Sequence, residues 1–114
     1  MFQSNANLAT EFAERRRAER DRIFLKTQIT WVRNNVAPVT LVDISETGFH
    51  ARTQATFAKN DRLRIMLPLV DNVPAEIAWN RDGYIGCRFI YHFEAIAFRQ
   101  LVEAIRTAPR PDSK

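Results

Sequence analysis

Five arginines lie close together near the start of the chain, with no lysine among them. They are Arg15, Arg16, Arg17, Arg20 and Arg22. A guanidinium group is a planar fork of donors that can make two parallel hydrogen bonds to a phosphate or to the O6 and N7 edge of guanine. Arg16 and Arg20 are four residues apart, so a helix would place both on one face, where they could clamp one ligand. Because Glu14, Glu19 and Asp21 lie in the same stretch, a solvated and partly neutralised surface is the competing interpretation.

A second group of polar residues follows an apolar stretch and has the pattern Asp43-x-Ser45-x-x-Gly48. An ordinary hairpin turn is one interpretation, because Asp and Ser side chains bond their own backbone and Gly supplies a positive φ. The same groups could also bind a ligand. A carboxylate can accept hydrogen bonds from N1 and N2 of guanine, a hydroxyl can donate to a phosphate or a base, and a glycine lets a ligand approach the backbone. The residues alone leave both interpretations open.

The stretches between and after these motifs predict strands, because short runs of β-branched and aromatic residues alternate with turn residues. The expected strands cover residues 24–32, 39–44, 48–53, 62–67, 73–79 and 84–90. Six short strands at close spacing favour an all-β fold, either a sandwich or a barrel, and the small size favours a closed antiparallel barrel without exposed edges. Alternation within the expected fifth strand predicts that Val73, Ala75, Ile77 and Trp79 share its buried side.

Helices are expected at both ends of this strand region. Residues 5–20 predict a short polar helix, and an apolar stripe from Ala97 to Ile105 predicts an amphipathic helix that packs on the barrel. The expected division is an N-terminal helical or flexible segment over 1–14, one domain over 15–108 and a disordered polar tail over 109–114.

Composition narrows the classes of function. The chain has 114 residues and a net charge of +4, which fits one domain with a preference for anionic partners. Its single cysteine, Cys87, excludes an internal disulfide. No apolar run is long enough to span a bilayer and no signal-peptide pattern is present, so we expect a cytoplasmic protein. Two histidines, His50 and His92, and three glycines offer neither metal-ligand spacing nor a phosphate loop, so we expect no enzyme, metal or cofactor.

Considered together, the two motifs resemble the PilZ domain family. An R-x-x-x-R pattern at Arg16–Arg20 precedes D-x-S-x-x-G by two dozen residues, and the doubled arginine at Arg16-Arg17 is common in the family. The runs Ile77-Ala78-Trp79 and Gly86-Cys87-Arg88-Phe89 are similar to its closing strand pair. The resemblance covers about Arg15 to Phe89 and the trailing helix. It implies a six-stranded antiparallel barrel that binds cyclic di-GMP, a bacterial second messenger.

The resemblance also implies roles for five motif residues. Arg16 and Arg20 would grip phosphate and guanine. Asp43 and Ser45 would bind a guanine edge, and Gly48 would keep the loop open. The ligand is therefore expected to lie between the arginine cluster and the loop.

Four further residues are weaker candidates. Arg15 precedes the motif, at a position that in the family influences whether one ligand or a stacked pair binds, and arginine there is compatible with a stacked pair. Trp79 could face a base, although a core position is the competing and preferred interpretation. His50 and Arg88 are further candidate contacts, and a lone histidine is more often a bystander.

The function implied is a cyclic di-GMP receptor or adaptor that changes conformation on binding. It would regulate an unidentified partner protein in motility, biofilm or polysaccharide pathways. One alternative is a small basic barrel for single-stranded nucleic acid, but Arg62 and Arg64 lack exposed aromatic neighbours in the sequence. Another alternative is an interaction module without a ligand, and the intact motif residues argue against it.

Overall fold

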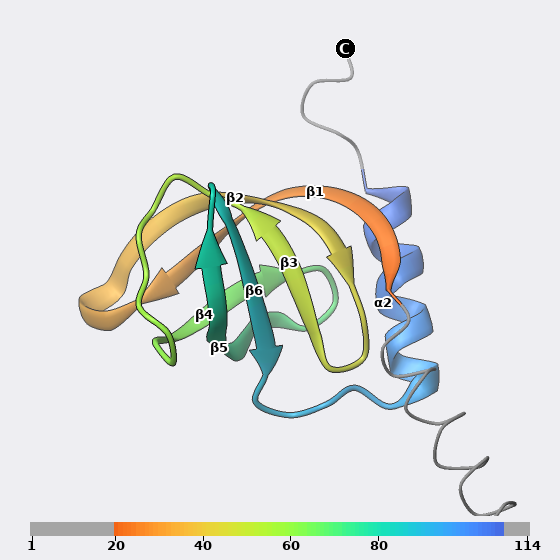
Figure 1. Ribbon diagram of the computed structural model, residues 1–114. Coiled ribbons are helices and arrows are strands. Elements are labelled where there is room, and N and C mark those ends of the chain that lie inside the picture. The colour runs from red at the N-terminus through yellow and green to blue at the C-terminus, as the bar shows by residue number, and fades with distance from the viewer. Residues whose placement is uncertain (1–19, 109–114) are drawn as a thin grey trace, which may run out of the picture.

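The computed structural model describes residues 20–108, which form a closed six-stranded antiparallel barrel with one helix beside it (Figure 1). Its elements are β1 (Asp21–Trp31), the 3-10 turn η1 (Val32–Asn34), β2 (Asn35–Ile44), β3 (Gly48–Arg52), β4 (Arg62–Leu67), β5 (Asp71–Arg81), β6 (Tyr84–Phe89) and α2 (Ala95–Thr107). The barrel and the C-terminal helix confirm two of the expectations from the sequence. The helix expected over 5–20 lies outside the described residues except for Arg20, which precedes β1. The tail 109–114 lies outside them too.

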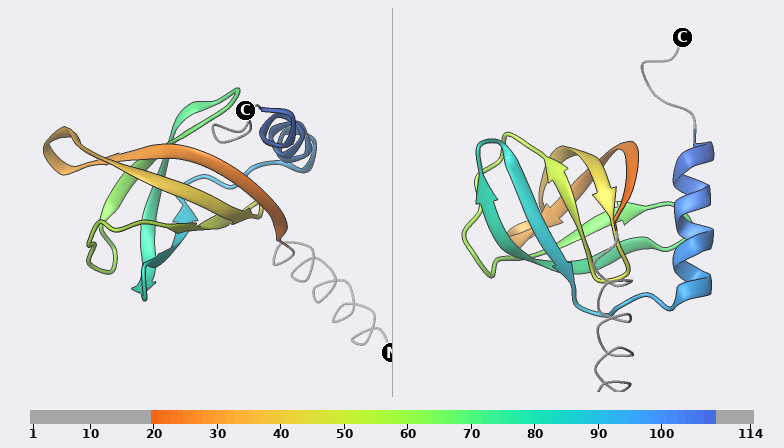
Figure 2. Two further views of the ribbon diagram at one scale, coloured as in Figure 1. Left: turned by 90° about the horizontal axis from the view of Figure 1, so that it is seen from above. Right: turned by 45° about the vertical axis from the view of Figure 1, so that its right-hand side comes forward.

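The strands are ordered β1-β2-β3-β6-β5-β4 around the barrel, and every neighbouring pair is antiparallel. The barrel closes where Ile29–Trp31 of β1 pairs with Leu63–Ile65 of β4. Closure pairs the strand edges that an open sheet would expose. Figure 2 shows the strands wrapping around a common interior, with α2 alongside the first half of β1.

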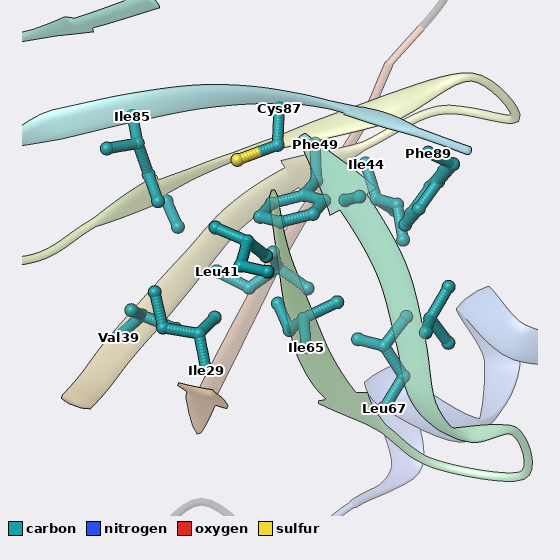
Figure 3. Packing of buried hydrophobic residues seen from close by; sticks show 14 of the residues in the cluster. Ile29, Val39, Leu41, Ile44, Phe49, Ile65, Leu67, Ile85, Cys87 and Phe89 are labelled. Atoms are coloured by element: carbon teal, nitrogen blue, oxygen red, sulfur yellow. The ribbon is translucent and has the colours of Figure 1, made fainter. Parts of the chain in front are cut away.

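Alternation along the strands builds the core, because successive side chains face opposite sides of the wall. In β4 the buried positions Leu63, Ile65 and Leu67 alternate with exposed ones, as the sequence predicts. Figure 3 shows Ile29, Leu41 and Ile65 converging inside the barrel. Helix α2 adds Leu101, Val102 and Ile105, which are buried against the barrel.

The expectation that Trp79 lies in the core is wrong. Val73, Ala75 and Ile77 are buried as expected, but Trp79 is 37% exposed. The pairing register of β5 with β6 shifts between Ile77 and Trp79, as at a β-bulge, so that one extra residue separates them. We call this irregularity the β5 bulge. It turns Trp79 to the outside of the barrel.

A second irregularity, the β2 bulge, lies between Leu41 and Asp43, where the register of β2 with β3 shifts. Leu41 is fully buried, whereas the next residue but one, Asp43, pairs with the partly exposed His50. Without the extra residue, Asp43 would share the inner face with Leu41. The β2 bulge therefore brings the Asp43 carboxylate to the outer surface.

Truncation of the barrel core should destabilise the protein much more than truncation of the adjacent outer position. We expect Ile65→Ala to lower the free energy of unfolding by about 2–5 kcal/mol, because it leaves a cavity beside Ile29. Met66→Ala, at the exposed neighbouring position, should cost less than about 1 kcal/mol. Urea unfolding followed by circular dichroism measures both changes. Equal costs would contradict the described orientation of β4.

Candidate functional site

Four residues form one row across the outer wall of the barrel, and this row is the centre of the candidate site. Asp43 of β2 pairs with His50 of β3, His50 pairs with Gly86 of β6, and Gly86 pairs with Trp79 of β5. The two bulges flank this row, one on each side, and each turns a candidate side chain, Asp43 or Trp79, outward. His50 and Gly86, more than thirty positions apart in the chain, are thereby placed side by side.

The Asp43 carboxylate is the most engaged polar group in the row. Its Oδ1 and Oδ2 lie 2.8 and 3.0 Å from Nδ1 of His50. Arg20 also donates to Oδ1 from Nη1 at 3.4 Å, a long contact. The structure thus brings one member of the arginine cluster together with the loop motif. Arg16 and Arg15 lie outside the described residues, so their places in the site stay predictions.

Trp79 forms an aromatic platform at the other end of the row. Its ring centroid lies 5.2 Å from that of His50 at a tilted angle, and the Arg81 guanidinium carbon lies 5.6 Å from the Trp79 ring centroid. Gly86 makes room for the indole, because a Cβ at this position would collide with it. An exposed aromatic ring with a cation beside it is suited to stacking on a nucleobase. Arg81 was missed from the sequence, although the Trp79-x-Arg81 spacing on one strand was a usable signal.

Ser45 holds the turn rather than facing solvent. It is fully buried, and its Oγ accepts hydrogen bonds from the backbone N–H groups of Thr47 and Gly48, both at 3.2 Å. The backbone N–H of Ser45 donates to the Gly48 carbonyl at 2.8 Å. The hairpin-turn interpretation therefore describes Ser45 in this structure, and direct contact with a ligand would require the loop to open.

The close approach of two strands explains why a glycine occupies position 48. It pairs with Arg88 of β6, and a Cβ at this position would collide with the carbonyl oxygen of Cys87. The positive φ expected for this glycine is not observed; among the described glycines only Gly83 has one. Gly48 thus allows β3 and β6 to approach each other directly beneath the loop.

Arg88 follows Gly86 by two residues on β6. It lies in the next row of residues whose side chains face the outside of the barrel. It is exposed and donates from Nη2 to Oε2 of Glu76 at 3.1 Å, and Arg62 lies 3.7 Å from Oε1 of the same carboxylate. The charge of Arg88 is therefore shared with Glu76, and its role as a ligand contact stays a prediction. Glu76 also partly neutralises Arg62. The nucleic-acid alternative requires Arg62 as an unpaired cation that can bind phosphate.

Among residues 20–108, no group of three or more His, Cys, Asp or Glu side chains is placed to hold a metal ion. Burial raises the pKa of the Cys87 thiol to about 12, so this cysteine stays protonated and unreactive at neutral pH. Within residues 20–108, no helix is long and apolar enough to cross a membrane.

Comparison with known proteins places the whole site within one family model. A model described as PilZ domain matches residues 14–107, which include the arginine cluster, the loop and the row from Asp43 to Trp79. No curated protein matches the chain. The matched region spans most of the 114 residues, so the likeness concerns the chain as a whole and not one motif.

The two glycines of the site should respond differently to a methyl group. Gly48→Ala forces backbone apart at the β3–β6 pair, and we expect the free energy of unfolding to fall by about 1–3 kcal/mol. The atoms nearest to a Cβ at Gly86 belong to the partly exposed Trp79 side chain, and not to backbone as at Gly48. We therefore expect Gly86→Ala to keep more of the stability and to change the tryptophan fluorescence. Chemical unfolding and fluorescence spectra of both variants test this contrast, and a fully stable Gly48→Ala would contradict it.

Proposed function

Because the chain belongs to the PilZ domain family, we propose that it binds cyclic di-GMP and acts as a receptor or adaptor rather than as an enzyme. Domains of this family are known cyclic di-GMP-binding modules. The observation that supports the proposal most is the contact between Arg20 and Asp43, because it brings the two halves of the motif together on the barrel surface.

In the proposed complex, cations bind the phosphates and one acid selects the base. Arg20 grips a phosphate or a guanine edge with a charged hydrogen bond, and Arg16 does the same from the preceding segment. Asp43 accepts hydrogen bonds from N1 and N2 of a guanine, which an adenine cannot supply in the same pattern. Arg15 would influence whether one ligand or a stacked pair binds. Ser45 supports this arrangement by holding the loop, as its hydrogen bonds indicate.

Trp79 is proposed as a stacking surface for a base. Its ring is exposed, it lies at the other end of the row from Asp43, and Arg81 adds a positive charge beside it. His50 lies between the acid and the indole. A guanine held at its edge by Asp43 would therefore have an aromatic surface within reach in the same row.

The proposed output is a change at the first residues of β1. Arg20 is followed by Asp21 and Arg22, and both are in contact with Arg106 of α2. Arg106 donates from Nη2 to the Arg22 carbonyl at 3.1 Å and lies 3.8 Å from Oδ1 of Asp21. A ligand that draws Arg20 away from Asp43 would thus act on residues adjacent to the α2 contact. The proposed receptor is cytoplasmic and would present this altered surface to a partner in motility, biofilm or polysaccharide pathways.

Binding can be tested directly by titration calorimetry with cyclic di-GMP. We expect Arg20→Ala to weaken binding about 10- to 150-fold, which corresponds to the loss of a charged hydrogen bond of about 1.5–3 kcal/mol. Arg64→Ala, an exposed arginine on β4, is the matched control and should leave affinity unchanged. A folded wild-type protein that binds no micromolar ligand would refute the receptor proposal. Binding of mixed-sequence single-stranded DNA with steep salt dependence would favour the nucleic-acid alternative instead.

The stacking role of Trp79 has its own test. We expect Trp79→Ala to weaken cyclic di-GMP binding by about 1–3 kcal/mol, the range for loss of stacking between one base and an aromatic side chain. Tyr91→Ala is the control, because Tyr91 is 75% exposed and lies outside the Asp43 row. Equal affinity of the two variants would show that the ligand does not use the indole.

A further inference from the structure

His50 is placed where it controls the acid that the proposed function assigns to guanine recognition. Its Nδ1 is 2.8 Å from Oδ1 and 3.0 Å from Oδ2 of Asp43, so it lies nearly midway between the two carboxylate oxygens. An ionised carboxylate only accepts hydrogen bonds, and Nδ1 must therefore carry the hydrogen. A single donor shared by both oxygens occupies the open face of the carboxylate.

Guanine would need that same face. Its N1–H and N2–H donate in parallel, one to each oxygen of a carboxylate, and this pair of donors straddles the position that Nδ1 now holds. We infer that His50 is an affinity-setting residue that blocks the guanine-reading face of Asp43 until the ligand displaces it. The inference rests on the proposed function, because it assumes that Asp43 reads a guanine.

The groups around the imidazole favour such a competition. Asp43 faces it from β2, Trp79 from β5 and the side-chain-free Gly86 from β6. The nearby cations are Arg20, which shares Oδ1 of Asp43, and Arg81, which lies against the far partner Trp79. Arg52 follows two residues later on the same strand, β3. Asp43 is the acid in direct contact with the ring, so it is the group whose hydrogen-bonding face the imidazole occupies.

This arrangement sets a cost on ligand binding. The ligand must break the hydrogen bond between His50 and Asp43 before the carboxylate can accept from guanine. Affinity for cyclic di-GMP should therefore rise when the imidazole donor is removed.

Titration calorimetry with cyclic di-GMP tests the inference. We expect His50→Leu, which removes the donor, to bind about 2- to 12-fold more tightly than the wild type, as for the loss of one competing neutral hydrogen bond. His50→Gln keeps a donor and should bind with an affinity closer to that of the wild type. His92→Leu is the control, because the chain has only these two histidines and His92 is exposed outside the site.

The outcomes separate this inference from the proposed function. Equal affinity of His50→Leu and the wild type refutes the role of His50 and leaves the receptor intact. Weaker binding by His50→Leu, with an unchanged unfolding temperature, would show that His50 supports the ligand and does not block it. A wild type that does not bind refutes the receptor itself. Long-range proton–nitrogen NMR spectra of the free protein provide a readout without ligand, and a hydrogen on Nε2 instead of Nδ1 would also refute the inference.

Discussion

In a regular strand, residues two apart face the same side of the wall, so Leu41 and Asp43 would share the barrel interior, and so would Ile77 and Trp79. An unpaired carboxylate inside the core would cost several kcal/mol or lose its charge. One extra residue in each of β2 and β5 changes the side of the barrel wall to which the following side chain points. The Asp43 carboxylate and the Trp79 indole then lie outside, while Leu41 and Ile77 stay in the core. The candidate site therefore depends on two local breaks in the strand periodicity on which the barrel core is built.

These breaks also mark the limit of what the sequence could predict. The alternation of buried and exposed residues was sufficient to predict the barrel strands, the buried positions of β4 and those in the first half of β5. The same rule, continued through Ala78, placed Trp79 in the core, because a bulge has no clear signature in residue type. Arg81 was missed because the expected strand ended at residue 79, whereas β5 continues to Arg81 and places it beside Trp79. Helix α2 was predictable from its apolar stripe, and its buried residues Leu101 and Ile105 belong to that stripe.

The loop motif combines two kinds of requirement that its spacing alone does not separate. Ser45 and Gly48 satisfy the backbone of the turn and allow β3 to lie close to β6, and both residues are buried. Asp43 makes its contacts on the outer surface, to Arg20 and His50. A hairpin-turn interpretation and a binding interpretation were therefore not exclusive. Ser45 and Gly48 shape the loop, and the loop helps to fix the position of Asp43.

In the proposed receptor, the cations near Asp43 supply affinity for phosphate, and the Asp43 carboxylate supplies selectivity for the base. Cations alone, such as Arg20, Arg52, Arg81 and Arg88 on the outer wall, would attract many phosphates with little regard for the base attached. A carboxylate among them repels phosphate and is satisfied only by a ligand that also carries donors, as guanine does. His50 satisfies the same carboxylate when no such ligand is present. The acid is then never left without a donor, and a base without the matching N–H groups gains nothing by displacing the imidazole.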